Sequence, residues 1–373
     1  MKKVGVGLVG SQFVSTIHAE SLKRVADAEI IAVVSKTEEH VKTFAKHHSI
    51  PYYFTDYKKM LEMDEIDMIV IGVPNYLHAQ VTVDAAKAGK HVVCEKPLCM
   101  NLKEADLMIE TCKKEKVKLM YAEELCFAPK YVRLKQLADE GALGNLYLVK
   151  QSEKHDGPHA PWFWDVELSG GGVVFDMGCH AFEFFRWILG KPEIESVYAD
   201  MGTYVHKDKT KGDDNSILIV KFANGATGLA EESWAKKGGM DDRSEVYGSE
   251  GVAYANLLMG NSILTYSDQG YGYAVEKAGS TKGWSFTIYE EAWNYGFPQE
   301  MEHFVDCVKN DKEPIETGED GRVVLEMIFA AYESARAGKK INLPFKTDAA
   351  KPFDLYQKLS EMPISLGVQT SYF

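Results

Sequence analysis

The N-terminal third of the chain alternates short apolar runs with segments of helical periodicity. Apolar runs of about four to eight residues between amphipathic stretches are typical of parallel βαβ units. The pattern therefore predicts an α/β fold with a doubly wound parallel sheet of the Rossmann type, which binds its ligand at the carboxyl ends of the strands. The predicted strands are 4–9, 29–34, 68–73, 91–94 and 118–121, and the predicted helices are 17–26, 38–47, 77–88 and 104–115.

Beyond about residue 125 the pattern changes to longer runs in which apolar and polar residues alternate. A period of two is typical of strands that bury one face. Asn224-Gly225 and Gly248-Ser249-Glu250-Gly251 are hairpin signals between such runs. We expect an α+β domain with a large, mainly antiparallel open sheet, one face of which is covered by helices. Its predicted strands are 145–154, 195–204, 216–222, 227–233 and 243–247, and a long helix is predicted over 321–338.

The length of the chain agrees with two domains. It has 373 residues, of which 45% are hydrophobic, and this is enough for two separate cores. We predict a dinucleotide-binding domain over 1–125 and a substrate-binding and oligomerisation domain over 126–345. A tail over 346–373 has little periodicity, and we expect it along the surface or along a neighbouring subunit. Because exposed faces of open sheets tend to be covered, we also expect a homo-oligomer.

Charge and cysteine content narrow the function classes. The formal net charge is -13 and the basic residues are dispersed, which argues against a nucleic-acid partner. The start of the chain is too short and glycine-rich for a signal peptide, and no long uncharged apolar stretch follows. We therefore expect a soluble cytoplasmic protein with no membrane partner. The six cysteines show no CxxC pair, so we interpret them as reduced and mostly structural.

The nucleotide loop is easy to misplace in this sequence. The segment 5–10 matches GxGxxG literally, yet it lies inside the first predicted strand, whereas a phosphate loop must follow the strand at a helix N-terminus. The turn itself begins at Gly10, continues through Gln12 and Phe13, and reaches Ser15. Gln12 and Ser15 stand at the second and third glycine positions. One glycine of three fits a dinucleotide site and a plain βα turn equally well.

The end of the second strand bears on the choice of cofactor. An acidic residue commonly holds the ribose hydroxyls of NAD at this place. This chain has Ser35 and Lys36 there, a hydroxyl and a cation that also tolerate the phosphate of NADP, while Glu38 and Glu39 lie close in sequence. We expect NAD as the cofactor, with NADP still open.

Two further strand ends complete the predicted cofactor site. Pro74 and Asn75 end the third long strand where the ribose and nicotinamide should lie, and His78 follows on the first helical turn. A structural turn and a helix cap are the alternative for these three residues. In Glu95-Lys96-Pro97 the proline biases Lys96 towards extended backbone at the strand's exit. The Lys96–Pro97 bond is open to both the cis and the trans form.

Three polar side chains are candidates for proton transfer in the oxidation of an alcohol. Removal of hydride from a secondary alcohol requires a base within reach of the hydroxyl. Lys96 can serve if burial and a positive nicotinamide depress its pKa, and His180 titrates near neutral pH. A helix that begins at Asp176 would place Asp176 and His180 on one face. Alternatively, Asp176 only caps that helix and Lys96 is a solvated surface residue.

The segment 154–165 combines three aromatic residues, two histidines and two carboxylates in a loop broken by proline and glycine. Aromatic faces stack on sugar rings, so we assign His155, Trp162 and Trp164 to substrate recognition. The alternative is that the aromatic residues anchor the loop on the core or on a subunit interface. The spacing of the histidines and acids around this loop and His180 matches no metal motif, so we expect no metal.

Short motifs of one known family are spread over nearly the whole chain. They are Gly10 with His18-Ala19-Glu20, Pro74-Asn75-Tyr76-Leu77-His78, Gly89-Lys90-His91-Val92, Glu95-Lys96-Pro97-Leu98, Gly141-Ala142-Leu143-Gly144, Gly170-Gly171-Gly172, Asp176-Met177-Gly178-Cys179-His180 and Gly318-Glu319-Asp320-Gly321. With them the chain resembles the glucose-fructose oxidoreductase, inositol dehydrogenase and rhizopine-catabolism (Gfo/Idh/MocA) family. The Glu-Lys-Pro motif is the most specific of these signals, and the glycine-poor first loop is the departure.

The resemblance implies a Rossmann domain and an open-sheet domain with the active site between them. It implies that Lys96 lies near the nicotinamide and that Asp176 and His180 hydrogen-bond the reacting hydroxyl. The expected function is an NAD(P)-dependent dehydrogenase acting on a ring CH–OH of a sugar, glycoside or cyclitol, with C3 of a glucoside as the best guess.

Three alternatives remain open. The first is an inositol dehydrogenase. The second is a glycoside-cleaving enzyme that uses transient oxidation and releases the aglycone without net cofactor turnover. The third is a non-catalytic nucleotide-binding regulator, for which Lys96→Ala would leave the biological function intact.

Overall fold

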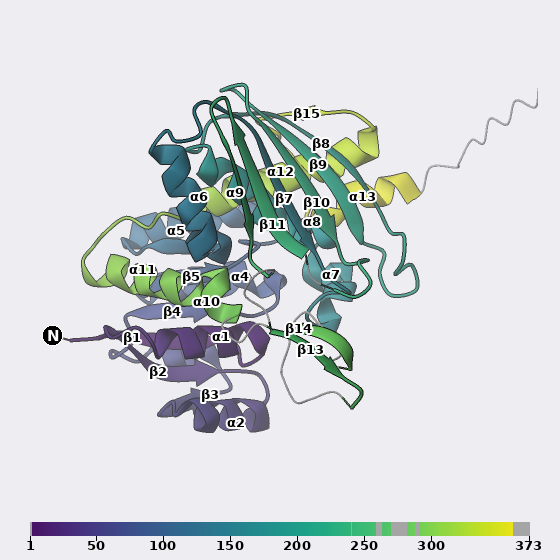
Figure 1. Ribbon diagram of the computed structural model, residues 1–373. Helices are drawn as coiled ribbons and strands as arrows, with labels where there is room; N and C mark the ends of the chain where they lie inside the picture. The colour runs from purple at the N-terminus through teal and green to yellow at the C-terminus, as the bar shows by residue number, and fades with distance from the viewer. Residues whose placement is uncertain (1, 240, 259–262, 270–281, 288–290, 361–373) are drawn as a thin grey trace, which may run out of the picture.

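Two sheets form the framework of the molecule. The computed structural model describes residues 2–239, 241–258, 263–269, 282–287 and 291–360. Figure 1 shows the N-terminal sheet, in purple and blue, below the large second sheet in teal and green. The carboxyl ends of the first sheet's strands therefore lie close to the second domain.

The first sheet is six-stranded and parallel, in the order β3-β2-β1-β4-β5-β6. This order reverses between β1 and β4, and the loops after these two strands diverge and leave a crevice for a ligand. The strands are β1 (Val4–Val9), β2 (Ala28–Val34), β3 (Tyr52–Phe54), β4 (Met68–Ile71), β5 (His91–Glu95) and β6 (Leu119–Ala122). The helices are α1 (Phe13–Leu22), α2 (Glu38–His48), α3 (Tyr57–Leu61), α4 (His78–Lys87) and α5 (Leu102–Glu115), with η1 (Asn75–Leu77) before α4.

The glycines of the literal GxGxxG match serve packing. Gly5 and Gly7 lie inside β1, which is buried throughout. A Cβ on Gly5 would lie 1.8 Å from the carbonyl oxygen of Glu65. The prediction that this match lies in the strand is confirmed.

The second sheet is seven-stranded, in the order β12-β11-β7-β10-β9-β8-β15. Its neighbours are antiparallel except β7 and β10, which run parallel, so the sheet is mixed but mainly antiparallel as predicted. The strands are β7 (Leu146–Lys154), β8 (Ile194–Gly202), β9 (Asn215–Phe222), β10 (Thr227–Ser233), β11 (Asp241–Gly248), β12 (Val252–Asn256) and β15 (Ile341–Asn342). A separate antiparallel pair is formed by β13 (Ile263–Ser267) and β14 (Gly283–Thr287).

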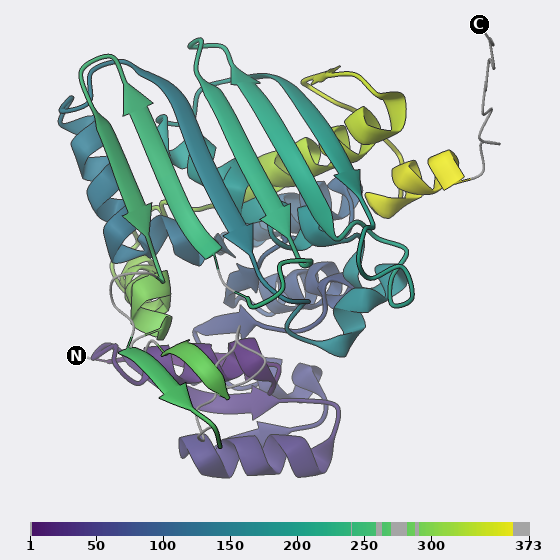
Figure 2. The same ribbon diagram turned by 45° about the vertical axis from the view of Figure 1, so that its right-hand side comes forward.

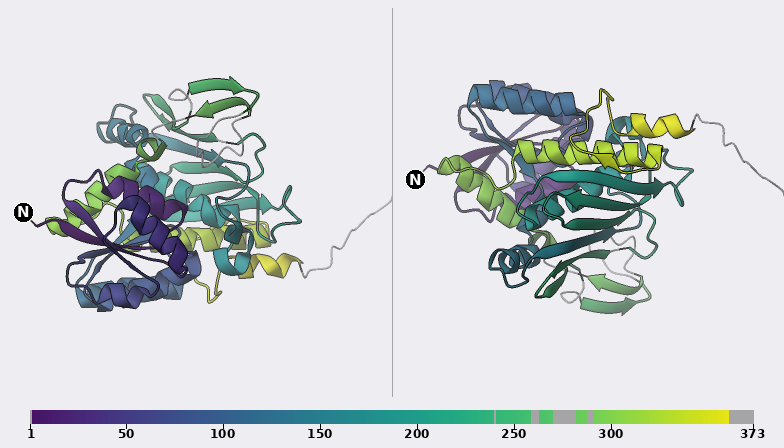
Figure 3. Two further views of the ribbon diagram at one scale, coloured as in Figure 1. Left: turned by 90° about the horizontal axis from the view of Figure 1, so that it is seen from below. Right: turned by 90° about the horizontal axis from the view of Figure 1, so that it is seen from above.

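Helices cover one face of this sheet, and the other face is open in Figure 2. The view from above in Figure 3 shows the long α12 lying along the sheet. Residues that face the helices, such as Leu218 and Val220, are buried, whereas Ile217 and β8's Tyr198 are exposed. The remaining helical elements are η2 (Glu124–Phe127), α6 (Pro129–Asp139), η3 (Pro161–Trp164), α7 (Val166–Ser169), α8 (Val173–Asp176), α9 (Gly178–Ile188), α10 (Glu291–Tyr295), α11 (Phe297–Lys309), α12 (Gly318–Ala337) and α13 (Phe353–Ser360).

Every strand predicted from the pattern is present, and β1 and β10 agree with their predictions at both ends. Both hairpin signals are confirmed as well, because the first joins β9 to β10 and the second joins β11 to β12. Helix α1 begins four residues before its predicted start and ends four before its predicted end, because the nucleotide turn is shorter than expected. Helices α6 and α11 were not predicted.

The segment after Phe345 contains a short helix. Lys346 and the residues after it lead into α13, which packs on α12 and buries Phe353 and Leu355. Their apolar side chains recur at too few positions for the pattern to reveal so short a helix. Residues 361–373 lie outside the described part of the chain.

All six cysteines are described residues, and each is buried and free of a disulfide, as predicted. Among the described residues, the helices include none that is long and apolar enough to cross a membrane.

Candidate active site

A cavity of about 440 Å³ lies at the carboxyl ends of the first sheet's strands and extends to the second sheet. Both domains contribute to its wall. We call the part lined by 9–14, 34–37 and 72–77 the cofactor half. We call the part lined by Glu95, Lys96, Glu124, Glu153, Met177 and His180 the catalytic half.

The turn after β1 fits the pyrophosphate of a dinucleotide. Gly10 has φ +125°, and a Cβ there would lie 2.3 Å from the carbonyl oxygen of Gly72 and 2.6 Å from Oγ of Ser15. Only glycine fits this position. Helix α1 begins at Phe13, and its N-cap Gln12 makes no side-chain capping bond. The first N–H groups of α1 therefore remain available to an anion.

The other predicted cofactor residues divide into two groups. Ser35, Lys36, Pro74 and Asn75 line the cofactor half, and the Asn75 amide also donates a hydrogen bond of 2.8 Å to the Ser169 carbonyl. His78 instead lies behind the cavity wall, fully buried. Its Nδ1 is 3.0 Å from the Pro97 carbonyl and its Nε2 is 2.8 Å from the Val73 carbonyl. The structure thus places His78 as a support for the two strand ends rather than beside a cofactor.

Glu95 is fixed from behind by a histidine. His18 on α1 donates from Nε2 to Glu95 Oε1 at 2.7 Å, and both side chains are buried. The other Glu95 oxygen accepts the backbone N–H of Lys96 at 3.1 Å. Burial alone would raise the pKa of Glu95, but His18, Lys96 and His78 together outweigh it and the pKa is lowered. The peptide bond that follows, Lys96–Pro97, is cis.

Lys96 is held by Asp176. Its Nζ donates to the Asp176 carbonyl at 2.9 Å and to Oδ1 at 3.1 Å, while Trp234 donates from Nε1 to Oδ2 at 3.2 Å. Burial acts to lower the pKa of Lys96, but the neighbouring acidic groups, Asp176 foremost, together reverse this and raise it well above the usual value. Correspondingly, Lys96, His155 and His180 together outweigh burial and lower the pKa of Asp176. The protein groups around Lys96 therefore favour its ammonium form, and its role as a base stays a prediction.

The helix around Asp176 also differs from the prediction. Asp176 ends the short helix α8, and α9 begins at Gly178 after a break at Met177. Asp176 therefore neither opens nor caps the helix that carries His180. The break turns its side chain towards Lys96 and Trp234.

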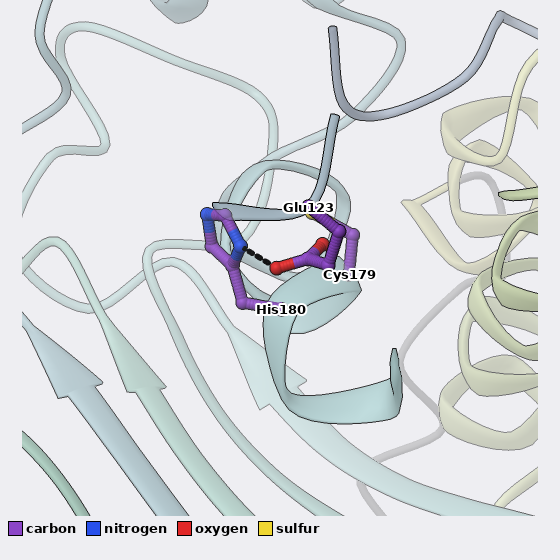
Figure 4. A group of neighbouring side chains, drawn as sticks. All are labelled: Glu123, Cys179 and His180. Carbon is purple, nitrogen blue, oxygen red and sulfur yellow. Dashed lines mark hydrogen bonds and ion pairs between the residues drawn. The ribbon is translucent and has the colours of Figure 1, made fainter. Parts of the chain in front are cut away.

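His180 pairs with a carboxylate that the sequence reasoning missed. Its Nδ1 donates to Glu123 Oε1 at 2.5 Å, and Figure 4 shows the other ring nitrogen pointing away from Glu123. Burial acts to lower the pKa of His180, but Glu123, Glu124 and Glu153 together outweigh it and the pKa rises to about 9. The neighbouring carboxylates therefore favour the protonated form of His180. Its Nε2 lies 3.8 Å from Oε1 of Glu124, which lines the cavity.

Glu123, Cys179 and His180 are close enough together to be considered as metal ligands. Nδ1 of His180 and Oε1 of Glu123 bind each other, however, whereas Glu123 Oε2 has no hydrogen-bond partner among the described residues. The Cys179 thiol donates to the Asp176 carbonyl at 3.0 Å, and burial raises its pKa well above the usual value. A cysteine binds metals as thiolate, so this arrangement favours the hydrogen-bonded pair over a metal centre.

Glu123 and Glu124 could have been predicted as site residues from their position in the sequence. They directly follow β6, and the carboxyl ends of parallel strands in such a sheet meet the ligand. Glu153 is harder to find, because it lies near the end of β7, a strand of the other domain. Only the packing of the two domains brings it to the catalytic half.

The aromatic residues of the loop 154–165 differ in position: some line the cavity and others anchor the loop on the protein. Trp162 and Phe163 line the cavity and stack on each other with their centroids 3.8 Å apart. Trp164 packs on Trp234 instead, with centroids 5.5 Å apart, and so anchors the loop. His155 is buried, and its Nδ1 lies 2.6 Å from the Gly157 carbonyl.

The parallel sheet with its reversed strand order, the glycine turn and the buried ion pairs define an oxidoreductase that binds a dinucleotide. Residues 4–123 match the oxidoreductase family with an NAD-binding Rossmann fold. Residues 131–254 match the GFO/IDH/MocA C-terminal domain. The chain belongs to the Gfo/Idh/MocA family of NAD-binding oxidoreductases.

Relatives match it over most of its length. Myo-inositol 2-dehydrogenase of Thermotoga maritima is 29% identical over 91% of this chain and 98% of its own. The rhizopine catabolism protein MocA of Rhizobium meliloti is 30% identical over 69% of this chain and 80% of its own. The crystal structure of GenD2 from gentamicin A biosynthesis, in complex with NAD, has a TM-score of 0.85 at 30% identity and covers 92% of this chain and 97% of that one.

Proposed function

We propose that the chain is an NAD-dependent dehydrogenase that oxidises a secondary ring hydroxyl of a sugar, glycoside or cyclitol, with C3 of a glucoside as the preferred position. The observation that carries the proposal is the convergence of Lys96 and His180 on one cavity with the nucleotide turn. Each of the two side chains is held by its own buried carboxylate. Fixed geometry of this kind suits a reacting hydroxyl.

The chain's residues would act on the hydroxyl oxygen. NAD, when bound, supplies the hydride acceptor. Lys96 and His180 donate hydrogen bonds to the substrate oxygen and stabilise the negative charge that develops on it. Asp176 and Glu123 keep the two donors charged and aimed. Glu95 fixes the backbone of Lys96 by accepting its N–H.

The wall beyond these residues supports a ring substrate. Trp162 offers an aromatic face on the cavity, and aromatic faces stack on sugar rings. His155 and Trp164 support the same loop from inside, and so affect recognition through its shape. A relative named myo-inositol 2-dehydrogenase that spans 91% of the chain makes inositols the second substrate class.

Mass spectrometry of a panel of glucosides and inositols, incubated with NAD or NADP, tests the proposal. We expect one compound to lose two hydrogens with the wild type and none to do so with Lys96→Ala. Release of an aglycone without net formation of NADH would replace the dehydrogenase with a glycoside-cleaving enzyme. An unchanged panel, with a second carbonyl compound offered as hydride acceptor, would refute the proposal.

We also propose that a second copy of the chain covers the open face of the second sheet. Large apolar side chains are exposed along this face, among them Tyr198, Ile217 and Tyr254, which is 66% exposed. Light scattering should show a homo-oligomer that Ile217→Lys weakens. A wild-type monomer at micromolar concentration would refute this proposal.

A further inference from the structure

The backbone that carries Lys96 is held on both sides by buried histidines. Before Lys96, Glu95 bonds to Nε2 of His18 at 2.7 Å and accepts the Lys96 N–H at 3.1 Å. After Lys96, the Pro97 carbonyl lies 3.0 Å from Nδ1 of His78. These contacts fix where the Lys96 side chain begins, and so they limit where its Nζ lies in the cavity.

His18 connects this backbone to the helix that begins at the nucleotide turn. Helix α1 begins at Phe13, and His18 lies five residues further along it, about 7.5 Å by the rise of a helix. A rigid helix carries a displacement of its first turn over this distance. The ring of Phe297 meets His18 at 80°, with centroids 6.0 Å apart, and so restricts rotation of the imidazole.

The imidazole of His18 is 1% exposed and serves Glu95 alone among the described residues, because its Nδ1 has no hydrogen-bond partner there. Glu95 lines the cavity, whereas His18 lies outside the described wall. A buried polar side chain is costly unless it is hydrogen-bonded. The bond to Glu95 therefore accounts for a histidine at this position, and any effect of His18 on the reaction must pass through Glu95.

We propose that His18 is a positioning residue that couples the nucleotide turn to Lys96 through Glu95, a role that rests on the proposed dehydrogenase function. An anion at the start of α1 fixes the first turn of the helix. His18 then fixes Glu95, and Glu95 fixes the N–H of Lys96. Bound nucleotide thus narrows the positions open to the Lys96 ammonium, and placement of this kind is worth about 10²-fold in rate.

Two substitutions that differ by one methylene separate the hydrogen bond from the rest of the side chain. In His18→Gln the amide nitrogen stands near the place of Nε2 and still donates to Glu95, whereas in His18→Asn it stands near Nδ1 and does not reach. We expect kcat of His18→Asn to fall by about 10- to 100-fold, with NAD affinity within about twofold of wild type. His18→Gln should stay within about threefold of the wild-type kcat. Steady-state kinetics and calorimetry with NAD measure the two quantities.

His48 supplies the matched control. It is another buried histidine of the first domain, with its Nδ1 2.9 Å from Glu20 Oε1, and it lies at the end of α2 outside the described wall of the cavity. Because His48 uses Nδ1, the disruptive substitution here is His48→Gln. It should lower the melting temperature and leave kcat unchanged.

A double-mutant cycle tests whether His18 acts through Lys96. In the Lys96→Ala background, His18→Asn should lower the remaining kcat by less than about twofold, because the side chain that it positions is absent. A general loss of structure would lower the rate by the same factor in both backgrounds. If His18→Asn does not fold, His18→Phe takes its place in the cycle, since it fills the space of the ring against Phe297 without a donor.

Hydrogen exchange measures the coupling without any substrate. In wild type and in His18→Gln, NAD should slow the exchange of the Lys96 N–H by at least about threefold. In His18→Asn, NAD should leave this exchange rate unchanged. The exchange therefore reports on Lys96 even where no turnover is measured.

The outcomes distinguish the coupling from the enzyme. A wild-type kcat in His18→Asn, or protection of the Lys96 N–H by NAD that persists in this variant, would refute the role of His18 and leave the dehydrogenase intact. Equal losses of rate in both backgrounds, or a failure of both His18→Asn and His18→Phe to fold, would make His18 structural and overturn the proposal. A wild type that oxidises no compound would refute the proposed function, while hydrogen exchange would still decide whether NAD is coupled to Lys96.

Discussion

The two halves of the cavity differ in how they use charge. The cofactor half presents backbone N–H groups at the start of α1, one glycine with positive φ, and short polar side chains after β2. The catalytic half presents buried ionised groups, each of which sets the pKa of its neighbours. The cofactor half suits a ligand through its shape and its backbone dipoles. The catalytic half holds ionisable groups at positions where they can exchange protons or stabilise charge.

This difference predicts different consequences of substitution. Changes in the cofactor half should alter binding and leave the pH dependence alone. Changes in the catalytic half should alter rate, pH dependence and stability together, because removal of one member of a buried ion pair leaves the other uncompensated at a cost of about 3–5 kcal/mol.

Lys96→Ala should show the largest effect. It removes a donor to the substrate oxygen and leaves the Asp176 carboxylate buried without its cation. We expect kcat/KM to fall by about 10³-fold or more and the free energy of unfolding to fall by about 3 kcal/mol. Steady-state kinetics and urea denaturation measure the two effects.

Lys90 offers a control for burial, because its Nζ is also largely enclosed but donates to the Met63 carbonyl, far from the cavity. Lys90→Ala should lose stability and keep kcat. If Lys96→Ala lost no more activity than Lys90→Ala, Lys96 would contribute to stability and not to catalysis.

Gly10→Ala should weaken NAD by at least about tenfold, with kcat at saturating NAD much less affected. An alanine Cβ would lie 2.3 Å from the Gly72 carbonyl and would push the turn away from the pyrophosphate. Gly89→Ala is the matched control, because Gly89 also has positive φ but a Cβ there would have no atom within 4 Å. Calorimetry with NAD compares the two variants. Equal NAD affinities of Gly10→Ala and Gly89→Ala would show that the turn after β1 does not hold the cofactor.

The same contrast explains what the sequence could predict. The cofactor half is local in sequence, so Gly10 and the strands around it were found from periodicity and motif position. The catalytic half is assembled from β5, η2, β7, the break after α8 and the start of α9, and its pairings depend on packing. Asp176 and His180 were predicted to act as one unit on one helix, yet each is held by a partner from the other domain.

Motif position alone could have drawn attention to Glu123 and Glu124 at the end of β6. It could not have revealed that Glu123 raises the pKa of His180. For Trp164 the residue type suggested substrate recognition, whereas in the folded chain its ring packs on Trp234 and anchors the loop. Pair formation and burial are properties of the folded chain, and a linear pattern does not contain them.

Glu123→Gln should change the pH dependence of stability. The pKa of His180 is raised to about 9, so its stabilisation by Glu123 is fully present below the unfolded value near 6.5 and disappears as the pH rises through 9. The melting temperature of Glu123→Gln should therefore fall furthest below wild type at about pH 6 and approach it at about pH 10. Thermal unfolding across this range measures the difference. If the difference in melting temperature between wild type and Glu123→Gln increased with pH, the stabilisation of protonated His180 by Glu123 would be contradicted.

Lys36→Ala should have the smallest effect and a selective one. Lys36 lines the cofactor half, where a cation favours the extra phosphate of NADP. Its removal should weaken NADP by up to about fivefold, the range of an exposed ion pair, and leave NAD within about twofold. Lys42→Ala is the control, because Lys42 is exposed on α2 and away from the cavity. The loss of NADP affinity caused by Lys36→Ala should become smaller at higher salt, because screening weakens the attraction between Lys36 and the extra phosphate. Equal losses for both nucleotides would assign Lys36 to the shared pyrophosphate or ribose instead.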